Sequence, residues 1–154
     1  MFRSGGFVGE HVDPVTESQI QPNGVDIRVS RIERPVGGGS IERTGKTIGT
    51  REEVEVVNGM YELDPGAYVV GYHERIRIPD EHIGFILPRS SLLRNGSTID
   101  TAVWDTGYEG RGEGLLSVGA PIEIEPEARI AQFVLASADH LGAYNGTYQR
   151  ERLD

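Results

Sequence analysis

Short segments of β character, separated by glycine and proline, constrain the fold of this chain most strongly. The 154 residues include 21 glycines and 8 prolines, which are scattered along the chain rather than gathered in a linker. The intervening runs are rich in branched and aromatic side chains, and turn signals recur about every 8 to 12 residues. This pattern predicts an all-β domain of the sandwich, jelly-roll or barrel kind.

The clearest element is a β-hairpin formed by residues 53–57 and 60–63. Asn58 and Gly59 lie between these two runs and supply the positive φ angles that a type I′ turn requires. Period-2 alternation and β-branched composition predict further strands at 68–70, 75–78, 83–87, 114–118, 122–124 and 129–135.

One short helix interrupts the strands. Ser90 or Ser91 can cap its N-terminus, Leu92 and Leu93 can form its inner face, and Gly96 can end it in a left-handed conformation. The donor-rich N-terminus would lie beside Arg89 and would suit an anion. An ordinary capped helix that fills one end of a barrel explains these residues equally well.

Composition excludes several classes of protein. A chain of this length with 37% hydrophobic residues fits one domain, residues 1–154. It contains no run near the roughly 20 apolar residues of a membrane span and no apolar leader after Met1, so we expect a cytoplasmic protein that does not insert into membranes. The absence of cysteine excludes disulfides, thiolate nucleophiles and cysteine-ligated zinc.

The charge of the chain argues against nucleic-acid binding. Its net charge is −9, and no basic stripe interleaved with aromatic residues offsets it. Lys46 is the only lysine among the 15 basic residues. An acidic, lysine-poor surface is tolerated at high salt, where screening weakens self-repulsion, so a halophilic source is one hypothesis. A genomic bias toward arginine codons is the alternative.

Three other motifs resemble functional sites, but the residues around them do not support those sites. Residues 40–47 (SIERTGKT) resemble a phosphate-binding P-loop, but serine opens the motif and no buried strand precedes it. Ser90 does not lie in the Gly-x-Ser-x-Gly elbow of a hydrolase, and the four histidines are isolated from one another. We interpret residues 34–50, which include three consecutive glycines, as a mobile insertion.

Five motifs in order resemble those of the trimeric dUTPase and dCTP deaminase superfamily. They are residues 21–28 (QPNGVDIR), 88–92 (PRSSL), 102–110 (AVWDTGYEG), 129–132 (RIAQ) and 144–149 (YNGTYQ). The similarity is greatest to archaeal dUTPases of the deaminase-like subgroup. It implies a distorted jelly-roll-like β-clip fold, a homotrimer with sites between subunits, and a deoxynucleoside triphosphate substrate.

The resemblance also implies roles for individual residues. Asp105 would orient a water and meet the sugar 3′-hydroxyl, Tyr108 would pack against deoxyribose, and the main chain through Ala102, Val103 and Trp104 would read the base. The phosphates would be bound by Arg89, Ser90, Ser91, Arg94 and Gln132, and by Tyr144, Tyr148 and Gln149 of a closing segment at about 140–154. In that segment Thr147 replaces the lysine usual in the family.

Several of these residues have simpler explanations. Asp105 can be an Asx-turn residue, and Tyr108 alone can be a core aromatic. Arg94 can offset a helix dipole, and Gln132 can satisfy backbone groups in an apolar strand. Asp26, within the first motif, can hold a strand end near a threefold interface.

One position separates the two reactions of the superfamily. The deaminases carry a glutamate ten residues after the aspartate, where it acts as general acid and base, and this chain has Leu115 there. Glu113 would face the same side of a strand but lies roughly 7 Å away along it. The sequence therefore favours Mg²⁺-assisted hydrolysis of dUTP to dUMP and pyrophosphate. A dCTP deaminase, a bifunctional enzyme and a catalytically silent nucleotide-binding module remain as alternatives.

The halophilic hypothesis predicts that salt stabilises the protein. We expect the melting temperature to rise as KCl is increased from low to molar concentration, because screening relieves repulsion among the excess acidic groups. Differential scanning calorimetry over a KCl series measures this directly. A melting temperature that falls as salt increases would contradict the hypothesis.

Overall fold

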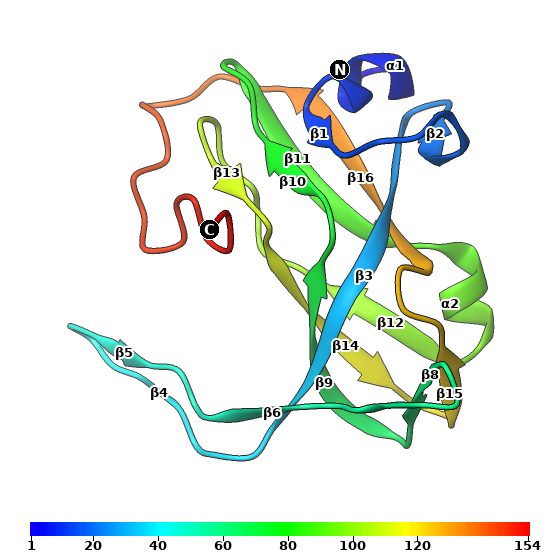
Figure 1. Cartoon of the computed structure of the whole chain (residues 1–154). Helices are drawn as coiled ribbons and strands as arrows, with labels where there is room; N and C mark the ends of the chain where they lie inside the picture. Colours follow the sequence, from blue (N-terminus) through cyan, green and yellow to red (C-terminus); the bar gives the residue numbers. More distant parts are fainter.

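A nearly closed β-sheet forms the body of the protein in the computed structural model, which describes residues 1–154 (Figure 1). The strands are β1 (Val12–Asp13), β2 (Ile20–Gln21), β3 (Gly24–Pro35), β4 (Ser40–Ile41), β5 (Lys46–Thr47), β6 (Arg51–Glu53), β7 (Val56–Val57), β8 (Met60–Leu63), β9 (Gly66–Tyr72), β10 (Arg75–Arg77), β11 (His82–Pro88), β12 (Ser97–Asp100), β13 (Glu109–Gly110), β14 (Glu113–Val118), β15 (Ile122–Ile124) and β16 (Arg129–Ser137). The helices are α1 (Gly5–Gly9), α2 (Ser90–Arg94) and a 3₁₀ turn, η1 (Glu17–Gln19). No helix is long or apolar enough to cross a membrane.

The longest strand, β3, joins the two halves of the main sheet. Its first part pairs with β16 and its second part with β9, with a register shift between Val29 and Arg31. The strand order is β11-β16-β3-β9-β14-β12, and β2 and β6 add to the edges of β3. Three smaller sheets, β1-β10-β13, β15-β8-β7 and β4-β5, complete the structure. The predicted all-β class is confirmed.

A single apolar core lies inside this sheet. It contains 25 buried side chains. From β3 alone, Val25, Ile27, Val29 and Ile32 are fully buried. Strand β14 alternates as predicted, because Gly114, Leu116 and Val118 face the core while Leu115 faces outward.

The predicted strands are present, but one predicted run is split between two strands. The run 53–57 belongs to two elements, because β6 pairs with β3 whereas β7 pairs with β8. Asn58 has φ 50° and Gly59 has φ 83°, so the predicted turn conformation is confirmed. Strand β3 was not predicted, because its polar and charged residues obscure the apolar alternation.

The short helix is present as α2, but the prediction of its cap was wrong. Arg89 is the N-cap residue, and no side chain caps the helix. Leu92 is buried as expected, whereas Leu93 is 52% exposed. Gly96 has φ +74°, which confirms the left-handed conformation after the helix. Helix α1 was not expected.

A buried carboxylate fastens β3 to the turn before β10. Glu74 is fully buried and accepts hydrogen bonds from the Arg28 main-chain nitrogen at 2.9 Å and from Arg28 Nε at 2.7 Å. The amide Nε2 of Gln19 donates to the same carboxylate at 2.9 Å and to the Asp26 carbonyl at 2.9 Å. A charge buried at this depth is stable only while its partners remain in place.

Replacement of this carboxylate should destabilise the fold. We expect Glu74→Gln to lower the free energy of unfolding by about 3 kcal/mol, because it leaves the Arg28 guanidinium without its buried counter-ion. Urea unfolding followed by circular dichroism measures the loss. The matched control is Glu62→Gln on β8, which removes an exposed carboxylate and should change stability by less than about 0.5 kcal/mol. Equal stability of the two variants would contradict this role of Glu74.

Candidate active site

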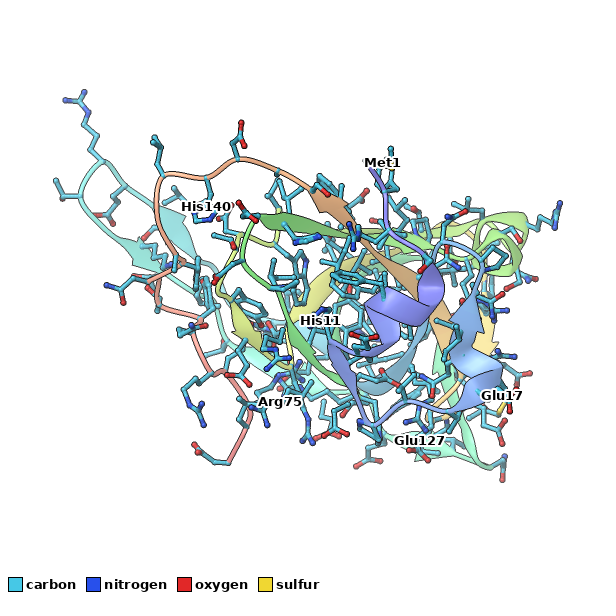
Figure 2. All side chains as sticks on the ribbon, turned by 90° about the horizontal axis from the view of Figure 1, so that it is seen from above. Met1, His11, Glu17, Arg75, Glu127 and His140 are labelled. Carbon is cyan, nitrogen blue, oxygen red and sulfur yellow. The ribbon has the colours of Figure 1, made fainter.

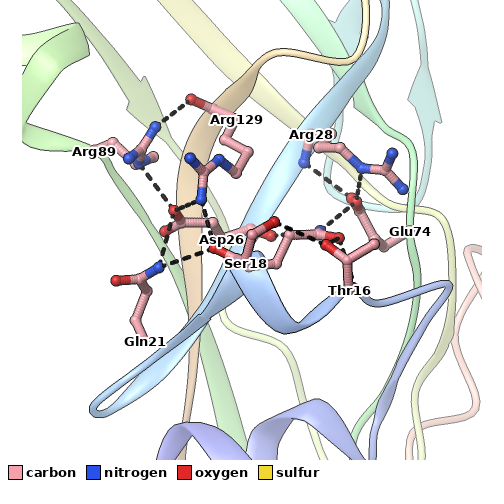
Figure 3. A network of polar contacts seen from close by, with 9 residues as sticks. Thr16, Ser18, Gln21, Asp26, Arg28, Glu74, Arg89 and Arg129 are labelled. Carbon is pink, nitrogen blue, oxygen red and sulfur yellow. Dashed lines mark hydrogen bonds and ion pairs between the residues drawn. The ribbon is translucent and has the colours of Figure 1, made fainter.

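Asp26 is the centre of a polar cluster at one end of β3, β11 and β16 (Figure 3). Its side chain is 2% exposed and lies 3.2 Å from Arg89 Nε and 3.3 Å from Arg129 Nη1. Burial raises the pKa of Asp26, while Arg89, Arg129 and a hydrogen bond with Gln132 act in the opposite direction. Gln132 lies directly opposite Asp26 in the strand register. The structural role left open for Asp26 therefore has a clear physical basis.

The residues predicted to bind phosphate around α2 lie on the same side as this cluster. Arg89 also donates from its main-chain nitrogen to Ile130 O at 3.0 Å and from Nη1 to Arg129 O at 3.0 Å. About a third of its side chain stays exposed. Ser90, Ser91 and Arg94 are exposed on α2. We call Arg89, Ser90, Ser91, Arg94 and Gln132 the α2 group.

Asp105 opens a tight turn on the far side of the sheet. The Tyr108 nitrogen donates to the Asp105 carbonyl at 3.1 Å, and Gly107 takes the positive φ of +79° that this turn requires. The main chain therefore closes the turn, and the Asp105 carboxylate does not act as an Asx cap. The carboxylate is exposed and forms no ion pair or side-chain hydrogen bond. It lies on the rim of two cavities, of about 230 and 500 Å³.

Aromatic rings form the wall of the smaller cavity. Trp104 and Tyr108 pack edge to face with centroids 4.9 Å apart, and Tyr144 packs against Tyr108 at 5.6 Å. Ala102 and Val103 line the same cavity and are exposed. Tyr108 is only 6% exposed, so it also contributes to the core, as the simpler explanation anticipated.

The closing segment folds over this turn. The Tyr144 nitrogen donates to Thr106 O at 2.7 Å, and Gln149 Nε2 donates to Gly107 O at 2.8 Å. Further along, the Tyr108 hydroxyl donates to Glu151 at 2.8 Å, and burial raises the pKa of Glu151. We call Ala102, Val103, Trp104, Asp105, Tyr108, Tyr144, Tyr148 and Gln149 the turn group.

Glu113 lies beside the turn group but its carboxylate is fully engaged. Arg31 Nη2 donates to one oxygen at 2.7 Å and Arg51 Nη1 to the other at 2.8 Å. Burial alone would lower the pKa of Arg51, yet the bond to Glu113 and the charges of Glu113 and Glu33 raise it. Leu115 follows on the same face of β14 and is 42% exposed. The two arginines were not predicted as site residues, because only the folded sheet brings 31, 51 and 113 together.

The α2 group and the turn group lie on opposite sides of the molecule. Figure 1 places α2 at one edge of the sheet and the closing segment at the other, and the view from above in Figure 2 agrees. No ion pair or aromatic contact joins the two groups. One chain therefore brings each group together separately, and it does not bring the α2 group to Asp105. No cluster of three or more His, Asp or Glu side chains that could hold a metal ion is present.

The comparisons with known proteins agree with this architecture. A family model described as dCTP deaminase-like matches residues 8–138. A probable deoxyuridine 5′-triphosphate nucleotidohydrolase of Halobacterium salinarum is 47% identical over 160 residues, covering all of this chain and 97% of the relative. The deoxyuridine 5′-triphosphate nucleotidohydrolase of Methanocaldococcus jannaschii is 42% identical, covering 89% of this chain and 91% of the relative. The first relative's source also fits the halophilic hypothesis.

Solved structures share the fold at low sequence identity. The 2′-deoxycytidine 5′-triphosphate deaminase of Agrobacterium tumefaciens aligns with a TM-score of 0.67 at 18% identity, over 87% of this chain and 48% of that one. A dUTPase of Staphylococcus bacteriophage 80alpha, solved with dUpNHpp, aligns with a TM-score of 0.51 at 16% identity, over 88% of this chain and 86% of that one. With the family match over most of its length, the chain belongs to the dCTP deaminase-like family, and among its close relatives are the deoxyuridine triphosphate nucleotidohydrolases.

Proposed function

We propose that this protein is a dUTP diphosphatase that hydrolyses dUTP to dUMP and pyrophosphate, in the cytoplasm. The observation that carries the proposal is the contrast between two carboxylates of the turn region. Asp105 is exposed and free of partners on the rim of a cavity, whereas Glu113 is bound by Arg31 and Arg51. A free carboxylate can accept a proton from water, but one bound by two guanidinium groups is a poor proton carrier.

The chemistry follows from the residues around Asp105. Its carboxylate orients a water molecule and takes a proton from it as the oxygen attacks the α-phosphorus in line, and the bond from the α-phosphorus to the bridging oxygen breaks so that pyrophosphate leaves. Guanidinium and hydroxyl donors of the α2 group stabilise the negative charge that develops on the phosphate chain. Tyr108 and Trp104 form an apolar wall for the sugar, and the main chain at the exposed residues Ala102 and Val103 would offer polar atoms to the base edge.

A complete site requires a second copy of the chain. Because the α2 group lies on the opposite side of the molecule from Asp105, a triphosphate bound at the turn group of one subunit cannot reach the α2 group of the same subunit. A cyclic oligomer solves this problem by placing the α2 group of one subunit against the turn group of its neighbour. We propose the homotrimer that the family resemblance implies.

Mg²⁺ fits the donor set of this site. Mg²⁺ prefers oxygen ligands from phosphates and water, and the exposed, unpaired Asp105 carboxylate can accept hydrogen bonds from water bound to the ion. The ion would neutralise phosphate charge when bound. The substrate phosphates and water would hold it, without a protein ligand, so the Asp105 carboxylate stays free to act on the attacking water.

Deamination of dCTP is the second candidate, because the matching family model is described as dCTP deaminase-like. That reaction needs a group that moves protons at the pyrimidine ring. Leu115 has no such group, and Glu113 is engaged with two arginines. The same geometry that supports hydrolysis therefore argues against deamination.

Asp105→Asn should separate binding from turnover. We expect the variant to bind the analogue dUpNHpp nearly as the parental protein does but to hydrolyse dUTP about two to four decades more slowly, the usual scale for loss of a general base. Single-turnover assays and titration calorimetry measure the two properties. Asp139→Asn is the matched control, because Asp139 is exposed on the larger cavity that Asp105 also lines, and it should keep the parental rate. Parental turnover by Asp105→Asn would refute the assignment of the base.

Mixed oligomers should test whether the site is shared. Asp105→Asn and Arg94→Ala chains carrying different tags are co-expressed, and the assemblies that retain both tags are purified. In a cyclic trimer with shared sites, each mixed assembly has one intact site, so about one third of the parental activity returns although each variant alone is impaired. Activity no higher than the mean of the two pure variants would show that each site is built within one chain.

A further inference from the structure

The hairpin of β4 and β5 belongs to an arm, residues 36–50, that projects from the end of β3. The Val36 nitrogen donates to Thr50 O at 2.9 Å and closes the base of the arm. Figures 1 and 2 both show the arm extending on the side of the molecule that carries the closing segment. Its base is continuous with Arg51, which binds Glu113 at 2.8 Å. The arm is therefore fixed to the turn region at its base.

The arm also forms one wall of a cavity. Gly37, Gly39 and Ile48 lie on one side of a space of about 440 Å³, and Thr101 and Ala102 lie on another. Ala102 belongs to the main chain that we propose contacts the base of the substrate. The arm thus faces the turn group rather than bulk solvent alone.

Lys46, the first residue of β5, places its ammonium group next to the closing segment. Its Nζ lies 4.4 Å from the centroid of the Tyr148 ring. Lys46 is exposed and has no carboxylate within ion-pair distance. The closing segment contributes no cation of its own between Tyr144 and Gln149. Tyr148 therefore has a positive charge beside it that comes from a distant part of the chain.

Nearby arginines are already occupied. Arg51 is bound by Glu113 and Glu33, and Arg150 lies 3.6 Å from Glu109. Arg152 donates to the main-chain carbonyls of the strand connection before β14, and burial lowers its pKa. The Lys46 ammonium, held by a ring face alone, is free to bind an anion.

We propose that Lys46 is a phosphate-binding residue, supplied by the arm to the triphosphate that the closing segment covers. An exposed cation–π contact is weaker than a hydrogen bond between two charged groups. A phosphate oxygen can therefore draw the ammonium from the ring or share it. This inference rests on the proposed function, because it takes the substrate to be a nucleoside triphosphate at the turn group.

Binding measurements on three variants test the proposal. Lys46→Ala should weaken binding of dUpNHpp about tenfold and leave binding of deoxyuridine unchanged, because deoxyuridine has no phosphate. Lys46→Arg should restore most of the affinity, since the charge is kept. Arg43→Ala is the matched control: it removes a cation from the same arm that contacts no aromatic ring, and it should bind both ligands as the parental protein does. Titration calorimetry at one fixed salt concentration gives all the constants.

Parental affinity of Lys46→Ala for dUpNHpp would overturn the proposal, and so would an equal loss of affinity for deoxyuridine, which would make the contact with Tyr148 purely structural. If the parental protein binds dUpNHpp in a Lys46-dependent manner but does not hydrolyse dUTP, the assignment of Lys46 is supported while the proposed function fails. If the parental protein does not bind dUpNHpp, both fail.

Discussion

A buried negative charge at Asp26 organises the side of the molecule that carries α2. The carboxylate lies between the guanidinium groups of Arg89 and Arg129, at 3.2 and 3.3 Å, and so connects β3, the end of β11 and the start of β16. Asp26 is 2% exposed, and an unpaired charge at this depth would destabilise the fold. The folded state therefore keeps both arginines beside it. The position of Arg89 fixes the first turn of α2, and with it the direction of the exposed Ser90 and Ser91.

Strand β3 separates the α2 group from the turn group. Strand β3 joins the two halves of the sheet, with Asp26 near its start and Arg31 in its second half, where Arg31 binds Glu113. The extended strand keeps these two positions apart. Under the proposed function, assembly of several chains becomes part of the chemistry, because the proposed phosphate donors and the carboxylate proposed to activate water belong to different faces.

The sequence was sufficient for local features and for motifs. The hairpin at Asn58 and Gly59, the alternation of β14 and the family itself were all readable, since each depends on neighbouring residues or on an ordered pattern. The cap of α2 was misread, because serine preference is a tendency that the geometry of Arg89 overrides. Contacts such as Glu113 with Arg51 and Lys46 with Tyr148 could not be predicted, since they join residues 62 and 102 positions apart.

The most direct test is to identify the products that the purified protein forms with Mg²⁺ and either dUTP or dCTP, resolved by ion-exchange chromatography. The account predicts dUMP and pyrophosphate from dUTP and no change in dCTP, because Asp105 is free to act on water and Leu115 cannot move a proton. Appearance of dUTP or dUMP from dCTP would contradict it and would identify Glu113 as the first residue to suspect. No product from either nucleotide would point to a binding protein rather than an enzyme.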